Sequence, residues 1–312
     1  MARLATAYVR RLNSLAVSHE AGLRLAPSNA DLLGASAVVE ISTGKWEEAV
    51  AHFTRAQALD PRSIIIGRRL AYTLLRLRRY PEALAACDRG LVLAPENLGM
   101  IENKAMVMLA QGDLPAARRV VGEAAAHIDP TNVVALFGNF YELYWILEPE
   151  QRDLLVRLTP SAFGDRATWA IVLAQTYRLQ GDRARTRAYS DSAVAAFDER
   201  LRGAPSDAQS HVFRGLALAY LGRKAEAIAE GEKAVALQPI TTNTFIGPYV
   251  QHQLVRIYIE AGEPEKALDR LEPLLRIPYY LSPAWLRIDP TFDPLRSNPR
   301  FRKLVEGTGI PS

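Results

Sequence analysis

The segment RLAYTLLRLRRYPEALAACDRGLVLAP, residues 69–95, is one copy of a phrase that recurs along the first half of the chain. Its closing letters LVLAP (91–95) have counterparts in LRLAP (23–27), QALDP (57–61) and AHIDP (126–130), so four prolines follow one another at intervals of 34, 34 and 35 residues. A fixed period of this length is typical of stacked copies of one supersecondary unit, each contacting only its neighbours. The chain is therefore predicted to be a repeat protein, whose units provide surface more often than chemistry.

Each unit is expected to hold two antiparallel helices. In Ala30–Ser63, the small Ala37 lets the helices pack closely, Gly44 makes the turn, and Phe53 and Ala56 belong to the apolar stripe of the second helix. A proline follows the second helix because proline cannot continue one. The same slots recur in Ile64–Asn97, Leu98–Thr131, Ala167–Arg202, Ala208–Thr241 and Pro248–Ile277. No strand pattern is present.

The period and the phrases TGKWEEAVAHFTRAQALDP (43–61) and GLALAYLGRKAEAIAEGEKAVALQP (215–239) resemble the tetratricopeptide repeat. This resemblance implies an all-α fold, a right-handed superhelical solenoid of stacked antiparallel helix pairs. It implies about 16–18 helices in about eight units, with a short helical C-terminal cap.

The predicted organisation is one continuous solenoid with four parts. Residues 1–131 form the N-terminal units, the first of them incomplete, and 132–166 form a divergent, irregular unit. Residues 167–277 form the C-terminal units, and 278–312 form a capping tail rich in Asx-Pro pairs. Within the irregular unit we expect a first helix through Phe140, Tyr141, Tyr144 and Trp145, and a short second helix around Leu154–Leu158.

The two ends of the stack differ. Residues 1–25 lack a corner glycine and fit one helix or two, and no polar capping unit precedes them. We therefore expect either an upstream segment that is missing or an open end that meets another chain or another copy. The tail has helix starts at Asp289-Pro290, Asp293-Pro294 and Asn298-Pro299. Its apolar side chains are expected to cover the last repeat; the alternative is a docking segment for another domain.

Composition argues against several classes of function. The net charge of +4 is spread along the chain without a Lys/Arg tract, so no nucleic-acid partner is expected. No apolar stretch reaches the ~18 residues that a membrane span needs. The five histidines lack metal-ligand spacing, and no phosphate-binding, protease or dinucleotide motif is present. We expect a cytoplasmic protein that is not an enzyme and has no metal or cofactor.

In the family that the chain resembles, first helices line a concave groove. The side chains that avoid the helix-pair stripe in one unit are Arg68, Arg69, Tyr72 and Arg76, and Asn103 of the next unit is expected beside Arg69. Arginine and asparagine in a groove can hold the carboxylates of an acidic peptide. The lysines of the two-carboxylate clamp found in chaperone-binding members are missing, and a solvated, arginine-bearing face is the alternative.

A second inner-face group combines aromatic, amide and basic side chains, which suits a pocket for an extended peptide because rigid aromatics are good anchors. Core packing, or burial beneath the tail, explains Phe213 and Tyr220 equally well. The group consists of Gln209, Phe213, Tyr220, Tyr249, His252 and Arg256.

The quoted phrases and the tail also resemble the C-terminal repeat half of bacterial multidomain signalling proteins. In those proteins a serine/threonine kinase, a nucleotide cyclase or a winged-helix regulator precedes the repeats. The chain contains no HRD or DFG phrase, no catalytic glycine-rich loop and no cyclase metal pair. The resemblance therefore implies a non-catalytic scaffold that binds a protein or peptide in its groove. The alternative is a regulatory fragment of such a protein, acting by oligomerisation or intramolecular control on an upstream effector domain.

Overall fold

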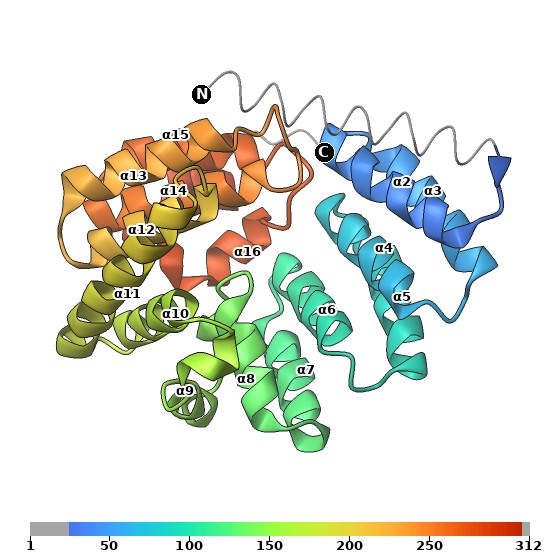
Figure 1. The fold of residues 1–312 in the computed structure, drawn as a ribbon, viewed down its shortest axis with the longest axis horizontal. Helices are drawn as coiled ribbons and strands as arrows, with labels where there is room; N and C mark the ends of the chain where they lie inside the picture. The colour runs from blue at the N-terminus through green and yellow to red at the C-terminus, as the bar shows by residue number, and fades with distance from the viewer. Residues whose placement is uncertain (1–24, 308–312) are drawn as a thin grey trace.

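The computed structural model describes residues 25–307, and every regular element in that range is a helix. Figure 1 shows helix pairs that follow one another round an arc, so that α14 and α15 return toward the side of the molecule that holds α2 and α3. This arrangement confirms the predicted all-α solenoid of stacked antiparallel pairs. Residues 1–24, with the question of one helix or two and the open N-terminal end, lie outside the described residues.

The regular pairs follow the repeat period. All the first helices except α14 begin after a residue whose side-chain oxygen accepts a hydrogen bond from a free backbone N–H, as Asn29, Ser63 and Asn97 do. The pairs are α2 (Ala30–Thr43) with α3 (Trp46–Leu59), α4 (Ile64–Arg76) with α5 (Tyr80–Leu93), α6 (Leu98–Ala110) with α7 (Leu114–His127), α10 (Arg166–Leu179) with α11 (Arg183–Gly203), α12 (Ala208–Tyr220) with α13 (Lys224–Leu237), and α14 (Gly247–Ala261) with α15 (Pro264–Leu274).

The corner between the two helices of a pair requires a left-handed backbone conformation. In the α4–α5 pair the residue with this conformation is Arg78, with φ of 59°. A side chain in this conformation costs about 1–2 kcal/mol relative to the right-handed region. The Arg78 guanidinium donates to the carbonyl oxygens of Leu275 (2.7 Å) and Ile277 (3.2 Å), nearly two hundred residues away. The other corners are glycines with φ between 76° and 87°: Gly44, Gly112, Gly181, Gly222 and Gly262.

The irregular unit turns earlier than its sequence predicts. Its elements are α8 (Pro130–Asn139), η1 (Leu143–Trp145), α9 (Pro149–Leu155) and η2 (Pro160–Phe163). A first helix running through Trp145 is therefore wrong, because Phe140 is extended and Tyr141 and Glu142 have φ of 53° and 54°. The buried Glu142 carboxylate accepts hydrogen bonds from Tyr249 Oη (2.5 Å) and Gln253 Nε2 (2.8 Å). Tertiary contacts with α14 thus favour this turn over continuation of the helix.

The tail forms the predicted helical cap on the last pair. Its elements are α16 (Pro283–Ile288), η3 (Pro290–Leu295) and α17 (Pro299–Val305). Asp289 and Asn298 cap the starts of η3 and α17, as two of the three Asx-Pro pairs predict; a helix start at Asp293-Pro294 is wrong, because this pair lies inside η3. The Arg300 guanidinium of α17 pairs with three carboxylates of α15, at 2.7–2.9 Å: Glu265, Asp269 and Glu272.

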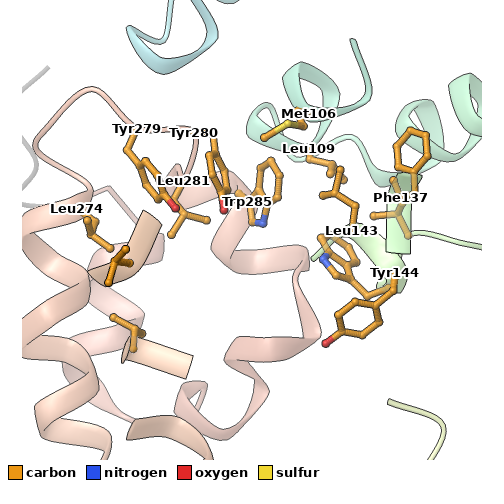
Figure 2. Packing of buried hydrophobic residues seen from close by; sticks show 14 of the residues in the cluster. Met106, Leu109, Phe137, Leu143, Tyr144, Leu274, Tyr279, Tyr280, Leu281 and Trp285 are labelled. Carbon is orange, nitrogen blue, oxygen red and sulfur yellow. The ribbon is translucent and has the colours of Figure 1, made fainter. Parts of the chain in front are cut away.

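The first part of the tail also passes into the centre of the arc, which the sequence did not predict. Tyr279, Tyr280 and Trp285 are almost fully buried there. Figure 2 shows Trp285 among side chains of α6 and η1, and Ser282 Oγ donates to the carbonyl oxygen of Ala110 in α6 at 2.6 Å. The tail therefore joins the two halves of the arc as well as covering its end.

The loop between α13 and α14 forms a second bridge across the arc, to the end of α2. In this loop Thr244 donates its N–H to Ser42 O (3.1 Å) and its hydroxyl to Ile41 O (2.5 Å), both near the end of α2. The free carbonyls of a helix C-terminus need such partners. The two bridges close the arc into a ring.

We predict that Arg78→Ala is less stable than Arg78→Gly by about 1 kcal/mol. Both variants lose the hydrogen bonds to Leu275 and Ile277, but only the alanine retains the strained backbone. Urea denaturation of the two variants measures the difference. Equal stabilities, or a more stable alanine variant, would contradict a strained corner at this position.

Candidate functional site

A cavity of about 250 Å³ lies at the centre of the ring. We call it the central cavity. Its walls come from α4, the α8–η1 turn, α10, α11, α12, the α13–α14 loop, α14 and the tail, so it exists only because the ring is closed. Two large apolar residues at its mouth remain exposed, Phe140 at 49% and Ile246 at 42%. Aromatic side chains are the largest class among its lining residues: Tyr72, Phe140, Tyr141, Phe197, Phe213, Phe245, Tyr249 and Tyr279.

The central cavity brings together residues that the sequence placed in two separate groups. Tyr72 and Arg76 of the first group line it together with Gln209, Phe213 and Tyr249 of the second. The curvature of the stack brings the two groups of residues to the same cavity. The tyrosines and phenylalanines contact one another, with Tyr72 and Phe245 edge to face at 5.7 Å between ring centroids.

Arg76 forms part of the cavity wall and is held by the protein itself. Its side chain is 1% exposed and donates to the carbonyl oxygens of Phe245 (3.0 Å) and Thr244 (3.4 Å). Its guanidinium carbon also lies 4.6–5.7 Å from the centres of four aromatic rings: Trp46, Tyr72, Phe245 and Tyr279. Stacking of a guanidinium on aromatic faces is favourable, and more so when water is excluded.

A buried polar network, which includes the cavity-lining residues Glu142, Gln175 and Tyr249, ties α8–η1, α10 and α14 together. Glu142 accepts from Tyr249 and Gln253, and Arg256 donates to Gln253 Oε1 (2.8 Å) and Gln175 Oε1 (2.6 Å). Burial raises the pKa of Glu142, and the Arg256 charge opposes that rise. The partners are satisfied within the protein, so the network fixes geometry and leaves little for a ligand.

The other members of the second group lie apart from the central cavity. Tyr220 and Arg256 line a different pocket, of about 250 Å³, beside η3. His252 is buried under the tail, with Nδ1 3.2 Å and 3.1 Å from the hydroxyls of Tyr279 and Tyr280. Burial lowers the pKa of His252 to about 3, so the ring is neutral.

A third pocket, of about 310 Å³, lies between α2, α4 and α6, and we call it the side cavity. It holds the rest of the first group: Arg68 and Arg69 are exposed, and Asn103 Nδ2 donates to Arg68 O at 3.0 Å. Tyr72, Tyr141 and Phe245 line both the side cavity and the central cavity. The sequence missed Glu102, which also lines the side cavity and is 5% exposed. The one available signal was its place next to Asn103 on an inner-face helix.

In the described residues, no group of three or more histidine, cysteine, aspartate or glutamate side chains is placed to hold a metal ion. Within residues 25–307, no helix combines the length and apolarity of a membrane span.

Family comparison agrees with this architecture. Models of the tetratricopeptide repeat match residues 68–133, 165–239 and 248–273. The chain belongs to the tetratricopeptide repeat family, whose members serve as scaffolds for protein interactions and whose fold is typically non-catalytic.

Among curated proteins, the chain is similar to U-box domain-containing protein 70 of Oryza sativa subsp. japonica, with 25% identity over 233 residues. The match covers 71% of this chain, and the chain spans 26% of the length of that relative.

Two solved structures have a similar helical arrangement. The Cut9-Hcn1 hetero-tetramer of the APC/C matches 97% of this chain and 53% of its own, with 14% identity and a TM-score of 0.48. A tetratricopeptide repeat protein from Parabacteroides merdae matches 97% of this chain and 94% of its own, with 15% identity and a TM-score of 0.38.

We expect Arg76→Met to lower the free energy of unfolding by about 3 kcal/mol or more, because two buried carbonyls lose their donor and four rings lose the stacked cation. Chemical denaturation measures the change. Arg69→Met, on the same helix but exposed, is the control and should differ little from the unsubstituted protein. Similar behaviour of the two variants would refute a structural role for Arg76.

The pH dependence of stability should change in Glu102→Gln. Burial raises the Glu102 pKa from 4.5 to about 8, with Arg68 opposing. Glu102 therefore ionises at a lower pH in the unfolded chain than in the folded protein, and the free energy of unfolding falls as pH rises from about 4.5 to about 8. The glutamine variant should be more stable by roughly 2–5 kcal/mol at pH 8 and nearly equal at pH 4. Parallel stability curves for Glu102→Gln and the exposed control Glu96→Gln would contradict this assignment.

Proposed function

We propose that this chain is a non-catalytic scaffold that binds a protein or peptide partner at the mouth of the central cavity. The observation that carries the proposal is an aromatic-walled cavity of about 250 Å³ whose mouth exposes Phe140 and Ile246. Exposed apolar side chains beside a concave site favour contact with a partner.

The cavity wall suggests how a partner would be anchored. An apolar or aromatic side chain of the partner would enter between Phe213, Phe245 and Tyr249, since buried aromatic anchors carry most of the energy of many interfaces. Asn139 and Gln209, which also line the cavity, offer amides for hydrogen bonds to an extended backbone. The anchor side chain would supply most of the binding free energy, and the hydrogen bonds to the amides would set the register of the bound segment.

Charge would influence which partners bind. Arg68 and Arg69 are exposed at the neighbouring side cavity, and the chain has a net charge of +4. An acidic segment next to the anchor residue would be attracted to these guanidinium groups. Arg76, His252 and Arg256 would support the site by holding its walls through Phe245, Tyr279 and Gln175, whereas Tyr220 lies apart from it.

The resemblance to repeat halves of bacterial signalling proteins favours a sensory or docking role in the cytoplasm, without a cofactor, nucleic-acid or membrane partner. The alternative is a regulatory region of a kinase, cyclase or transcriptional regulator that acts on an effector domain or by self-association. The rice relative, in which the matched region is 26% of the length, is an example of such repeats within a longer protein.

Peptide display tests the proposal. Peptides selected on the unsubstituted protein should share an aromatic or large aliphatic residue, and Ile246→Asp with Phe140→Asp should weaken their binding at least tenfold by placing charge at the apolar mouth. Val92→Asp, at an 82% exposed position that does not line this cavity, is the matched control. Equal loss in the control, or none in the double variant, would place the partner elsewhere.

A further inference from the structure

The side cavity contains a buried charged group that the fold does not use. Glu102 is 5% exposed, and its Oε1 atom has no hydrogen-bond partner. Among the hydrogen bonds and ion pairs of residues 25–307, none involves the Glu102 carboxylate. The other buried carboxylates of the interior are satisfied: Glu142 accepts two hydrogen bonds, and Asp289 accepts from Thr291 N and Trp285 Nε1.

Burial of an unpaired carboxyl group is unfavourable, whether it remains charged or takes up a proton. An apolar side chain at this position of α6 would avoid that penalty. Glu102 lines a pocket of about 310 Å³, at the lower end of the range for small-molecule sites and far larger than one water molecule needs. The arrangement fits a carboxylate kept for a ligand.

The surroundings of Glu102 define which ligand would fit. Tyr72, Tyr141 and Phe245 give the cavity an aromatic wall, and aromatic faces attract cations. A carboxylate next to aromatic rings is suited to an ammonium group.

The entrance of the side cavity is suited to an anion, in contrast to its interior. Arg68 and Arg69 are exposed, and within the described chain neither guanidinium has an ion-pair or hydrogen-bond partner. Guanidinium groups are suited to a carboxylate. A ligand that satisfies both ends must carry a cation inside and an anion outside.

We propose that the side cavity binds a free α-amino acid, with its ammonium group on Glu102 and its carboxylate on Arg68 and Arg69. The aromatic wall would contact the amino-acid side chain, and Asn103 Oδ1 would accept a further ammonium hydrogen bond. The site differs from the mouth of the central cavity, so this proposal stands whether or not a peptide binds there.

Ionisation of Glu102 makes binding sensitive to pH. Burial raises the pKa of this carboxyl to about 8, with Arg68 opposing, so the empty site is mostly protonated at pH 7. An ammonium ligand requires the ionised form, and binding therefore releases a proton. The other charged or titratable groups that line the cavity are Arg69 and Tyr72 of α4 and Tyr141 of the α8–η1 turn; the pKa of each tyrosine is raised by burial, so both are neutral.

Isothermal titration calorimetry of the full chain with each of the twenty amino acids tests the proposal. At least one should bind, and its N-acetyl and amide derivatives should bind at least tenfold more weakly. Affinity should rise several-fold from pH 6.5 to pH 7.5, and the heat should depend on the ionisation enthalpy of the buffer.

Variants separate the two ends of the site. Glu102→Gln should lose at least tenfold in affinity together with the proton release, whereas Arg68→Gln with Arg69→Gln should lose affinity but keep the proton release. Arg89→Gln, which removes an exposed arginine elsewhere, is the control for net charge. The proposal is wrong if no amino acid binds, if the N-acetyl derivative binds equally well, if only dipeptides bind, or if Glu102→Gln binds normally.

Discussion

The stacked and hydrogen-bonded guanidinium of Arg76 joins the two sides of the ring. It belongs to the second described repeat, yet its acceptors are backbone carbonyls of residues 244 and 245, and Tyr279 of the tail covers it. A buried cation needs partners for its donors. The α13–α14 loop must therefore lie against α4, and the central cavity, the side cavity and the path of the tail all depend on that approach.

Closure changes what the inner face of a solenoid can offer. In an open superhelix the first helices would form one continuous groove. Here Tyr279, Tyr280 and Trp285 fill the centre, so the space that remains is divided into separate cavities. A partner can insert single side chains or small groups but cannot lie along the full inner surface, and specificity would rest on a few deep contacts.

The sequence predicts the helix pairs well because their slots depend on local patterns: the small residue at Ala37 and the corner at Gly44 follow from chain geometry alone. The turn at Tyr141 and Glu142 depends on contacts with α14, which no local pattern contains. Tyr72 and Phe213 were both assigned to the inner face, but curvature brings them together, and curvature accumulates over many small rotations. Glu102 was missed because a carboxylate on a helix usually indicates a solvated face.

The bridge from Thr244 to Ile41 and Ser42 has a consequence for how this protein can evolve. Open repeat proteins can gain units by duplication and lose them by deletion, because each copy contacts only its neighbours. A helix pair inserted or deleted between α2 and the α13–α14 loop would move this loop away from the end of α2 and leave the carbonyls of Ile41 and Ser42 without donors. The number of units between α2 and the α13–α14 loop is therefore fixed, and variation in that span is restricted to substitutions within a constant number of units.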